Sequence, residues 1–131
     1  MRKEVITHQD PKSPISEIFK TLRTNIQFMN ANKKMKTILV TSTFPGEGKS
    51  WVSSNLAVTF AQAGKRVVLI DADMRKGRQY TIFGVSPRPG LSNYLSGIID
   101  NEEASDDLTN YIQETEIDNL NFSRKYTTKS I

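Results

Sequence analysis

The chain has 131 residues, a formal net charge of +4, one histidine and no cysteine, which fits a single domain and excludes disulfides and thiolate metal sites. Much of the positive charge comes from Arg124, Lys125 and Lys129, whereas residues 100–107 are acidic, so the charge does not favour nucleic-acid binding. Because no apolar run could cross a bilayer and the charged N-terminus lacks a secretion signal, we expect a cytoplasmic protein without a transmembrane segment.

The N-terminal part of the chain predicts an arm followed by a helix. Residues 1–12 are polar, which predicts a flexible N-terminal arm. A helix should begin at Pro14, because Ser13 can cap its free amides and proline suits the first turn. Apolar side chains then recur at helical spacing and should share one buried face: Ile15, Ile18, Phe19, Leu22, Ile26 and Met29.

The middle of the chain predicts an α/β fold. "TILVTS" (37–42) and "KRVVLID" (65–71) have the pattern of short buried strands, and a helix should lie between them within residues 48–64, ending at Gly64. Two such strands joined by a helix predict a parallel βαβ unit with helices on both faces of the sheet. Further along, "GLSNYLSGI" suggests a short helix and "DNLNF" the start of another strand.

"TSTFPGEGKS", residues 41–50, resembles the phosphate-loop pattern GxxxxGK[ST], with Thr43 at the first glycine position. Gly46 and Gly48 can turn backbone amides toward an anion, and the helix that follows adds its own free amides. Lys49 can reach the outer phosphates, and Ser50 can ligate magnesium. The strand, loop and helix stand in the order that such a site requires, whereas a chance glycine turn would need none of them.

Two carboxylates follow the second predicted strand. Asp71 lies at its carboxyl end and Asp73 two residues later, at the edge where open parallel sheets bind ligands. Asp71 can hold magnesium through water, and Asp73 can orient an attacking hydroxyl or accept its proton; the alternative is that both cap a helix or turn. The basic residues beyond them could contact phosphate or an acidic peptide, or could belong to a solvated loop: Arg75, Lys76 and Arg78.

Together these segments resemble the bacterial tyrosine kinases of capsular and exopolysaccharide synthesis. The resemblance covers roughly residues 13–122 and rests on "SPISEIFKTLRTNIQF", "TSTFPGEGKSWVSSNLA", "VVLIDADMRKGR" and "GLSNYLSG", in that order. That family tolerates other residues than glycine at the position of Thr43. The resemblance implies that residues 13–122 are the N-terminal part of a P-loop kinase domain.

The resemblance also implies ATP and Mg²⁺ as cofactors and assigns site residues. The catalytic residues would be Lys49, Asp71 and Asp73, and the metal ligands Ser50 and Asp71. The residues expected at the nucleotide are Pro45, Gly46, Glu47, Gly48, Lys49, Ser50, Trp51 and Arg75. Gly77 and Tyr80 stand where the family usually has proline and histidine.

The partners that the resemblance implies are a second copy, an adaptor and a substrate. Ring-like self-association would use the family motif ExxRxxR, which corresponds here to Glu17, Lys20 and Arg23. Lys20 keeps the charge of the family's arginine and loses its planar pair of donors. A cytoplasmic tail of a membrane adaptor would activate the kinase, and tyrosine-containing proteins would be its substrates.

The end of the chain departs from the family pattern, which continues with a Walker B strand and a tyrosine-rich tail. "YTTKSI" can be encoded so that a reading frame shifted by one nucleotide gives the family's next element, "PPNPS". We therefore expect residues 123–131 to be an aberrant or disordered tail of a C-terminally truncated kinase domain, in which the truncation could abolish activity; an ordinary disordered tail is the alternative.

Two other functions compete with the kinase. One is a partition or cell-division-positioning ATPase, but such an ATPase would favour a lysine near the start of the loop, where Thr43 and Phe44 stand. The other is a non-catalytic nucleotide-binding remnant.

Overall fold

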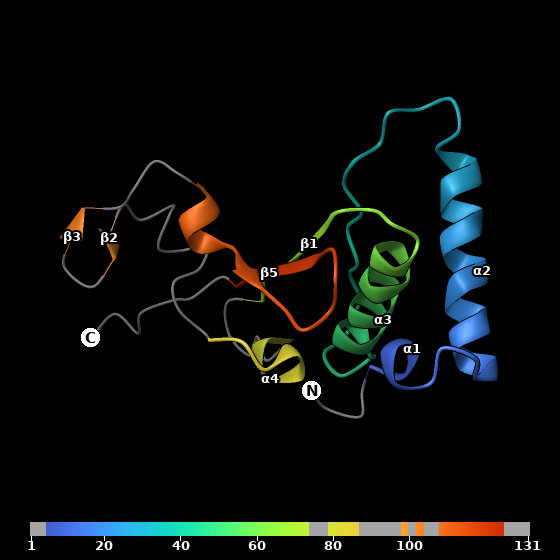
Figure 1. The fold of residues 1–131 in the computed structure, drawn as a ribbon, viewed down its shortest axis with the longest axis horizontal. Helices are drawn as coiled ribbons and strands as arrows, with labels where there is room; N and C mark the ends of the chain where they lie inside the picture. Colours follow the sequence, from blue (N-terminus) through green and yellow to red (C-terminus); the bar gives the residue numbers. More distant parts are fainter. Residues whose placement is uncertain (1–4, 74–78, 87–97, 100–101, 104–107, 125–131) are drawn as a thin grey trace.

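Three helices come first along the chain in the computed structural model, which describes residues 5–73, 79–86, 98–99, 102–103 and 108–124. They are α1 (Ile6–Gln9), α2 (Pro14–Met29) and α3 (Lys49–Gln62). Figure 1 shows α3 between α2 and the strands, and α3 contacts α1, α2 and β1 (Val67–Asp71). α3 is therefore the element around which the described part of the fold is arranged.

The two long helices begin and end where the sequence predicts. The Ser13 hydroxyl caps α2 by accepting a hydrogen bond from the Ser16 amide at 3.1 Å. After α3, Gly64 adopts a left-handed conformation with φ of 81°. The amides of Gly64 and Lys65 donate to the carbonyls of Ala61 and Phe60 at 3.0 and 3.1 Å, which closes the end of the helix.

The main sheet has three strands, in the order β1, β5, β4. β1 runs parallel to β5 (Leu120–Arg124), which confirms the strand predicted at "DNLNF", and β5 runs antiparallel to β4 (Gln113–Glu114). The remaining elements are α4 (Gln79–Phe83), β2 (Ile98–Ile99), β3 (Glu102–Glu103) and η1 (Leu108–Tyr111). The predicted α/β class is therefore confirmed.

The core lies on one face of this sheet. Leu120 and Phe122 point to that face and are buried against α3, α4 and the partly buried side chains of Val67 and Leu69. The alternating residues of β1 on the other face, Val68 and Ile70, are 45% and 50% exposed. Within the described residues the helices thus cover one face, rather than the two faces expected from the sequence.

The prediction of a strand at residues 37–42 is wrong, because this segment has no strand structure. The segment approaches α3 without strand structure, and Ile38 and Leu39 are 50% and 84% exposed. An apolar run becomes a strand only where a neighbouring strand receives its backbone hydrogen bonds, and the described strand that pairs with β1 is β5. The parallel pair therefore forms between β1 and β5, instead of between residues 37–42 and β1.

The prediction of a flexible arm over residues 1–12 is also wrong for residues 5–12, the part that the structure describes. Val5 and Thr7 are fully buried, and residues 6–9 form α1. The Thr7 amide and hydroxyl donate to Asn55 Oδ1 on α3 at 3.1 and 2.9 Å. A polar segment is thus held by partners that lie far away in the sequence.

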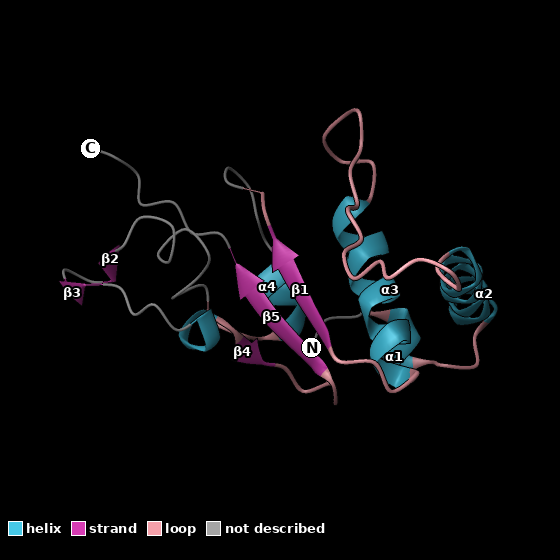
Figure 2. Cartoon of the chain, turned by 90° about the horizontal axis from the view of Figure 1, so that it is seen from above, coloured by secondary structure: helices cyan, strands magenta, loops and turns pink. Residues whose placement is uncertain are grey.

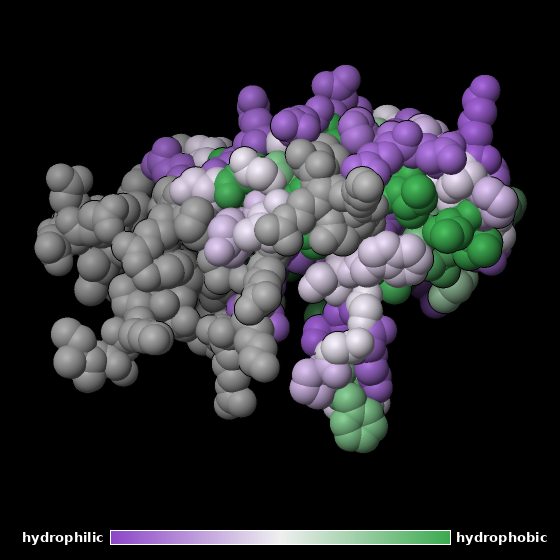
Figure 3. All heavy atoms as spheres, turned by 90° about the horizontal axis from the view of Figure 1, so that it is seen from below, coloured by the Kyte–Doolittle hydropathy of each residue, from purple (hydrophilic) through white to green (hydrophobic). Residues whose placement is uncertain are grey.

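Two further expectations change at the surface and at the end of the chain. Of the apolar face predicted for α2, Phe19 is buried, whereas Ile15, Ile18 and Leu22 are 43%, 66% and 38% exposed. Figure 3 shows hydrophobic side chains gathered at the right-hand end of the molecule, where α2 lies. Ser123, expected to begin an aberrant tail, is buried within β5; residues 125–131 and most of the predicted helix at 90–98 lie outside the described residues.

Candidate nucleotide-binding site

The loop before α3 has the backbone shape that a phosphate cradle needs. Gly46 and Gly48 have φ values of 80° and 90°, in the left-handed region that side chains disfavour. No atom lies within 4 Å of the place where a Cβ would stand at either glycine, so the backbone conformation, rather than crowding, demands glycine here. Thr43, at the first position of the pattern, has no positive φ and therefore needs no glycine.

The first turn of α3 leaves its amides available to a ligand. Gly48 is the N-cap and provides no side-chain hydrogen bond, and the Val52 amide makes a helical bond to the Gly48 carbonyl at 2.9 Å. The amides of Lys49, Ser50 and Trp51 precede this bond and have no partner within the helix. Free amides and the positive end of the helix dipole together favour an anion at this position.

Lys49 brings a positive charge to the same place. It is the first residue of α3 and is half-buried. Over the described ranges of the chain, the one ion pair joins Lys20 and Glu17, so no described carboxylate neutralises Lys49. The ammonium group is therefore available to an anionic ligand.

Asp71 lies at the same end of the molecule as the loop. Figure 2 shows the carboxyl ends of β1 and β5 and the amino end of α3 pointing the same way. Asp71 is 6% exposed, and its two oxygens accept backbone hydrogen bonds from Asp73 at 3.1 Å and Gln79 at 3.3 Å. Its carboxylate is thus fixed in orientation, and Asp73, two residues later, is exposed.

Gln79 connects Asp71 with α3, a role that the sequence did not predict. Its side-chain Nε2 donates to Ser53 Oγ at 2.6 Å and to the Ser50 carbonyl at 3.5 Å, while its backbone amide holds Asp71. Ser53 Oγ in turn donates to the Lys49 carbonyl at 2.7 Å. Neither Gln79 nor Ser53 stands in the phosphate-loop pattern, so no local signal marked them.

The oxygen donors at this end suit magnesium better than a transition metal. Ser50 offers a hydroxyl and Asp71 a carboxylate, which are hard ligands. The described residues contain no group of three or more side chains of the kind that holds a metal ion by itself. Mg²⁺ needs few protein ligands, because it keeps several waters and is also bound by phosphate oxygens of the substrate.

The other residues predicted at the nucleotide differ in their exposure, and one of them lies outside the described residues. Pro45, Gly46 and Glu47 are exposed in the loop. Trp51 is 39% exposed, and its ring makes a T-shaped contact with the ring of Phe19 on α2, with centroids 5.2 Å apart. Arg75 lies outside the described residues, as do Lys76 and Arg78.

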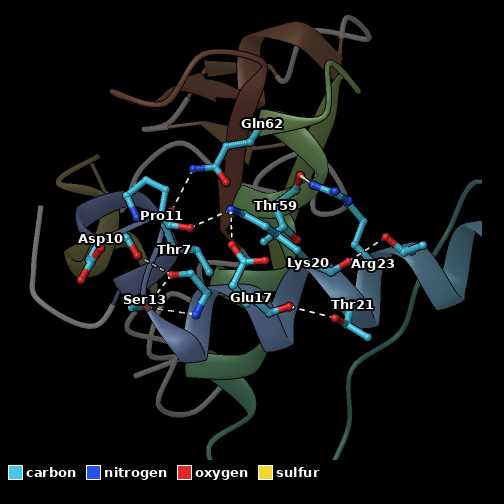
Figure 4. Close-up of polar contacts among 12 residues, drawn as sticks. Thr7, Asp10, Pro11, Ser13, Glu17, Lys20, Thr21, Arg23, Thr59 and Gln62 are labelled. Carbon is cyan, nitrogen blue, oxygen red and sulfur yellow. Dashed lines mark hydrogen bonds and ion pairs between the residues drawn. The ribbon is translucent and has the colours of Figure 1, made fainter.

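The residues predicted for self-association make contacts within the chain (Figure 4). Lys20 Nζ contacts Glu17 Oε1 at 2.9 Å and the Pro11 carbonyl at 2.7 Å. Arg23 Nη1 donates to the Thr59 carbonyl in the last turn of α3 at 2.8 Å. The helix dipole makes that end of α3 favourable for a cation. These side chains therefore help to hold α2 on the rest of the molecule.

Comparison with known proteins places this loop in a nucleotide-binding family. Residues 38–88 match the CobQ/CobB/MinD/ParA nucleotide binding domain. The chain is 48% identical over 95 residues to the tyrosine-protein kinase YwqD of Bacillus subtilis, an alignment that covers 72% of this chain and 40% of YwqD. It thus spans less than half the length of that relative.

Solved structures show the same similarity. The crystal structure of the chimerical protein CapA2B2 has a TM-score of 0.77 and 38% identity, covering 94% of this chain and 51% of that one. The BceF tyrosine kinase domain has a TM-score of 0.75 and 39% identity, covering 92% of this chain and 45% of its own. No helix in the described part of the chain is long and apolar enough to span a membrane.

Proposed function

Because this chain belongs to the bacterial tyrosine kinase family, we propose that it binds Mg-ATP at the loop before α3 and supplies this part of a protein-tyrosine kinase. The observation that carries the proposal is the cradle itself: left-handed Gly46 and Gly48, free amides at the start of α3, and a Lys49 without an anionic neighbour among the described residues. The family relationship favours a kinase over a partition-type ATPase.

Each residue of the site would have a separate role in phosphoryl transfer. The loop amides and Lys49 would hold the phosphates, and Ser50 and Asp71 would hold Mg²⁺, which neutralises developing charge. The tyrosine oxygen forms a bond to the γ-phosphorus while the bond from that phosphorus to the β–γ bridging oxygen breaks, releasing ADP. The exposed Asp73 carboxylate accepts the hydroxyl proton.

The wider setting is part of the same proposal. The substrate would be a tyrosine-containing protein, the regulated process capsular or exopolysaccharide synthesis, and the activator the cytoplasmic tail of a membrane adaptor, with the kinase in the cytoplasm. Self-association through Glu17, Lys20 and Arg23 would bring a tyrosine of one copy to the site of another. Arg23 bonds the Thr59 carbonyl within the chain, a contact that such association would exchange for one between copies.

The test uses radiolabelled ATP with the purified chain, with and without an adaptor tail and a tyrosine-rich peptide. Phosphotyrosine on the peptide supports a kinase. Free phosphate without labelled tyrosine supports the ATPase, and binding without either product supports a nucleotide-binding remnant.

Lys49→Ala should weaken ATP binding by about tenfold or more, because a charge-assisted hydrogen bond contributes roughly 1.5–3 kcal/mol. The matched control is Lys65→Ala, which removes an exposed lysine beyond the other end of α3. Binding is measured by isothermal titration calorimetry. Equal affinities of the Lys49→Ala and Lys65→Ala variants would refute the assignment of the loop as the phosphate site.

A further inference from the structure

Gln79 connects the first turn of α3 with Asp71 at the end of β1. It is the first residue of α4 and is 6% exposed. Its backbone amide donates to Asp71 Oδ2, and its side-chain Nε2 donates to Ser53 Oγ and to the Ser50 carbonyl. One residue therefore touches both positions, Ser50 and Asp71, to which the magnesium ion is assigned.

The side-chain oxygen of Gln79 has no partner. Oε1 is buried and receives no hydrogen bond within the described structure. The neighbouring Ser50 carbonyl can only accept, which requires the amide nitrogen to face it and fixes the orientation of the amide. Covalent geometry places Oε1 about 2.3 Å from Nε2, and hence beside the first turn of α3. Buried acceptors are normally paired, so a donor outside the described residues, such as a bound water, can complete the hydrogen bonding of this oxygen.

We infer that Gln79 is a positioning residue for the hydrated magnesium ion, with Oε1 accepting a hydrogen bond from a metal-bound water. The inference rests on the proposed function, namely that Mg-ATP binds at the loop. Mg²⁺ retains several waters in sites of this kind, and their protons are donors. Outer contacts of this sort orient the ligands of a metal and raise its affinity. Gln79 would act through this water, which makes it a positioning residue and not a catalytic one.

The test separates magnesium-dependent from magnesium-independent binding. ATP affinity of the chain is measured by calorimetry in excess EDTA and in Mg²⁺. For Gln79→Leu, which lacks the acceptor, we expect an affinity in EDTA within about twofold of the unmodified chain and a roughly tenfold smaller gain from Mg²⁺.

Ser53→Ala is the matched control, because it removes one of the two partners of Nε2 and keeps the other, the Ser50 carbonyl, together with Oε1. It should retain most of the gain from Mg²⁺. If Ser53→Ala matched Gln79→Leu, or if Gln79→Leu lost affinity equally in EDTA and Mg²⁺, Gln79 would be a purely structural residue and the inference would be overturned.

Two further outcomes are distinguishable. Thermal unfolding checks that each variant is folded, and Gln79→Met, which has a similar length and no acceptor oxygen, replaces Gln79→Leu if the latter does not fold. Absence of ATP binding by the unmodified chain in both buffers would refute the proposed function itself. Binding that Lys49→Ala weakens while Gln79→Leu keeps the full gain from Mg²⁺ would refute the inference alone.

Discussion

Thr7 and Asn55 show how much one buried contact organises at the N-terminus. Thr7 is fully buried, and both its amide and its hydroxyl reach Asn55 Oδ1. Asn55 Nδ2 donates at the same time to the Trp51 carbonyl in the first turn of α3, at 2.9 Å. The N-terminal segment is thereby linked to the helix that begins at the phosphate loop.

We expect Thr7→Val to lower the free energy of unfolding by about 1 kcal/mol, because it removes a buried hydroxyl hydrogen bond and nearly preserves the volume. Thr21→Val is the matched control, since Thr21 is exposed on α2 and its hydroxyl bonds only the carbonyl of Glu17. Figure 4 labels both threonines. Urea denaturation measures the difference, and equal effects of the two substitutions would contradict the role given to Thr7.

At the scale of secondary structure, the end of α3 depends on the backbone of Gly64. Its φ of 81° permits the paired hydrogen bonds that close the helix, and no atom lies within 4 Å of the position of an added Cβ. A substitution there should therefore act through the backbone and not through a steric clash.

Gly64→Ala should destabilise the chain by about 1–2 kcal/mol, the cost of a left-handed conformation for an ordinary residue. Gly64→Asn should cost less, because asparagine visits this conformation more readily. Thermal or urea unfolding of the two variants tests the order. A smaller loss for alanine than for asparagine would show that the conformation is not what the position requires.

The elements that the sequence predicted correctly are those specified locally. Ser13, Pro14 and Gly64 lie beside the helix ends that they determine, and the turn before α3 depends on Gly46 and Gly48, which lie within that turn. The failures involve distant partners. Asn55, which orders Thr7, is 48 residues away, and the pairing of a strand at residues 37–42 depends on an edge elsewhere in the chain. Gln79 was missed for the same reason, because its partners lie on α3.

At the scale of the whole molecule, apolar side chains are exposed on α2 and on β1. Ile15, Ile18 and Leu22 form an exposed stripe along α2, and Val68 and Ile70 are exposed on the sheet. Exposed apolar surface of this kind promotes association. The same helix carries the residues predicted for contact between copies. We therefore expect a second copy of the chain to cover this stripe.

We therefore expect the purified chain to self-associate as its concentration rises, and Ile18→Glu to reduce that association by placing a charge in the stripe. Asn32→Glu adds the same charge to an exposed position beyond the end of α2 and should change the association little. Light scattering coupled to size-exclusion chromatography measures the mass. A chain that stays monomeric throughout, or an equal response to both substitutions, would contradict this expectation.

Trp51 gives this molecule a built-in optical reporter. It is the only tryptophan of the chain, it lies in the first turn of α3 beside the loop, and its ring meets Phe19 of α2. Its intrinsic fluorescence therefore comes from a single point where the cradle and α2 touch. Emission of the unlabelled protein can follow rearrangement at that contact during a titration, without a dye or a substitution in the site.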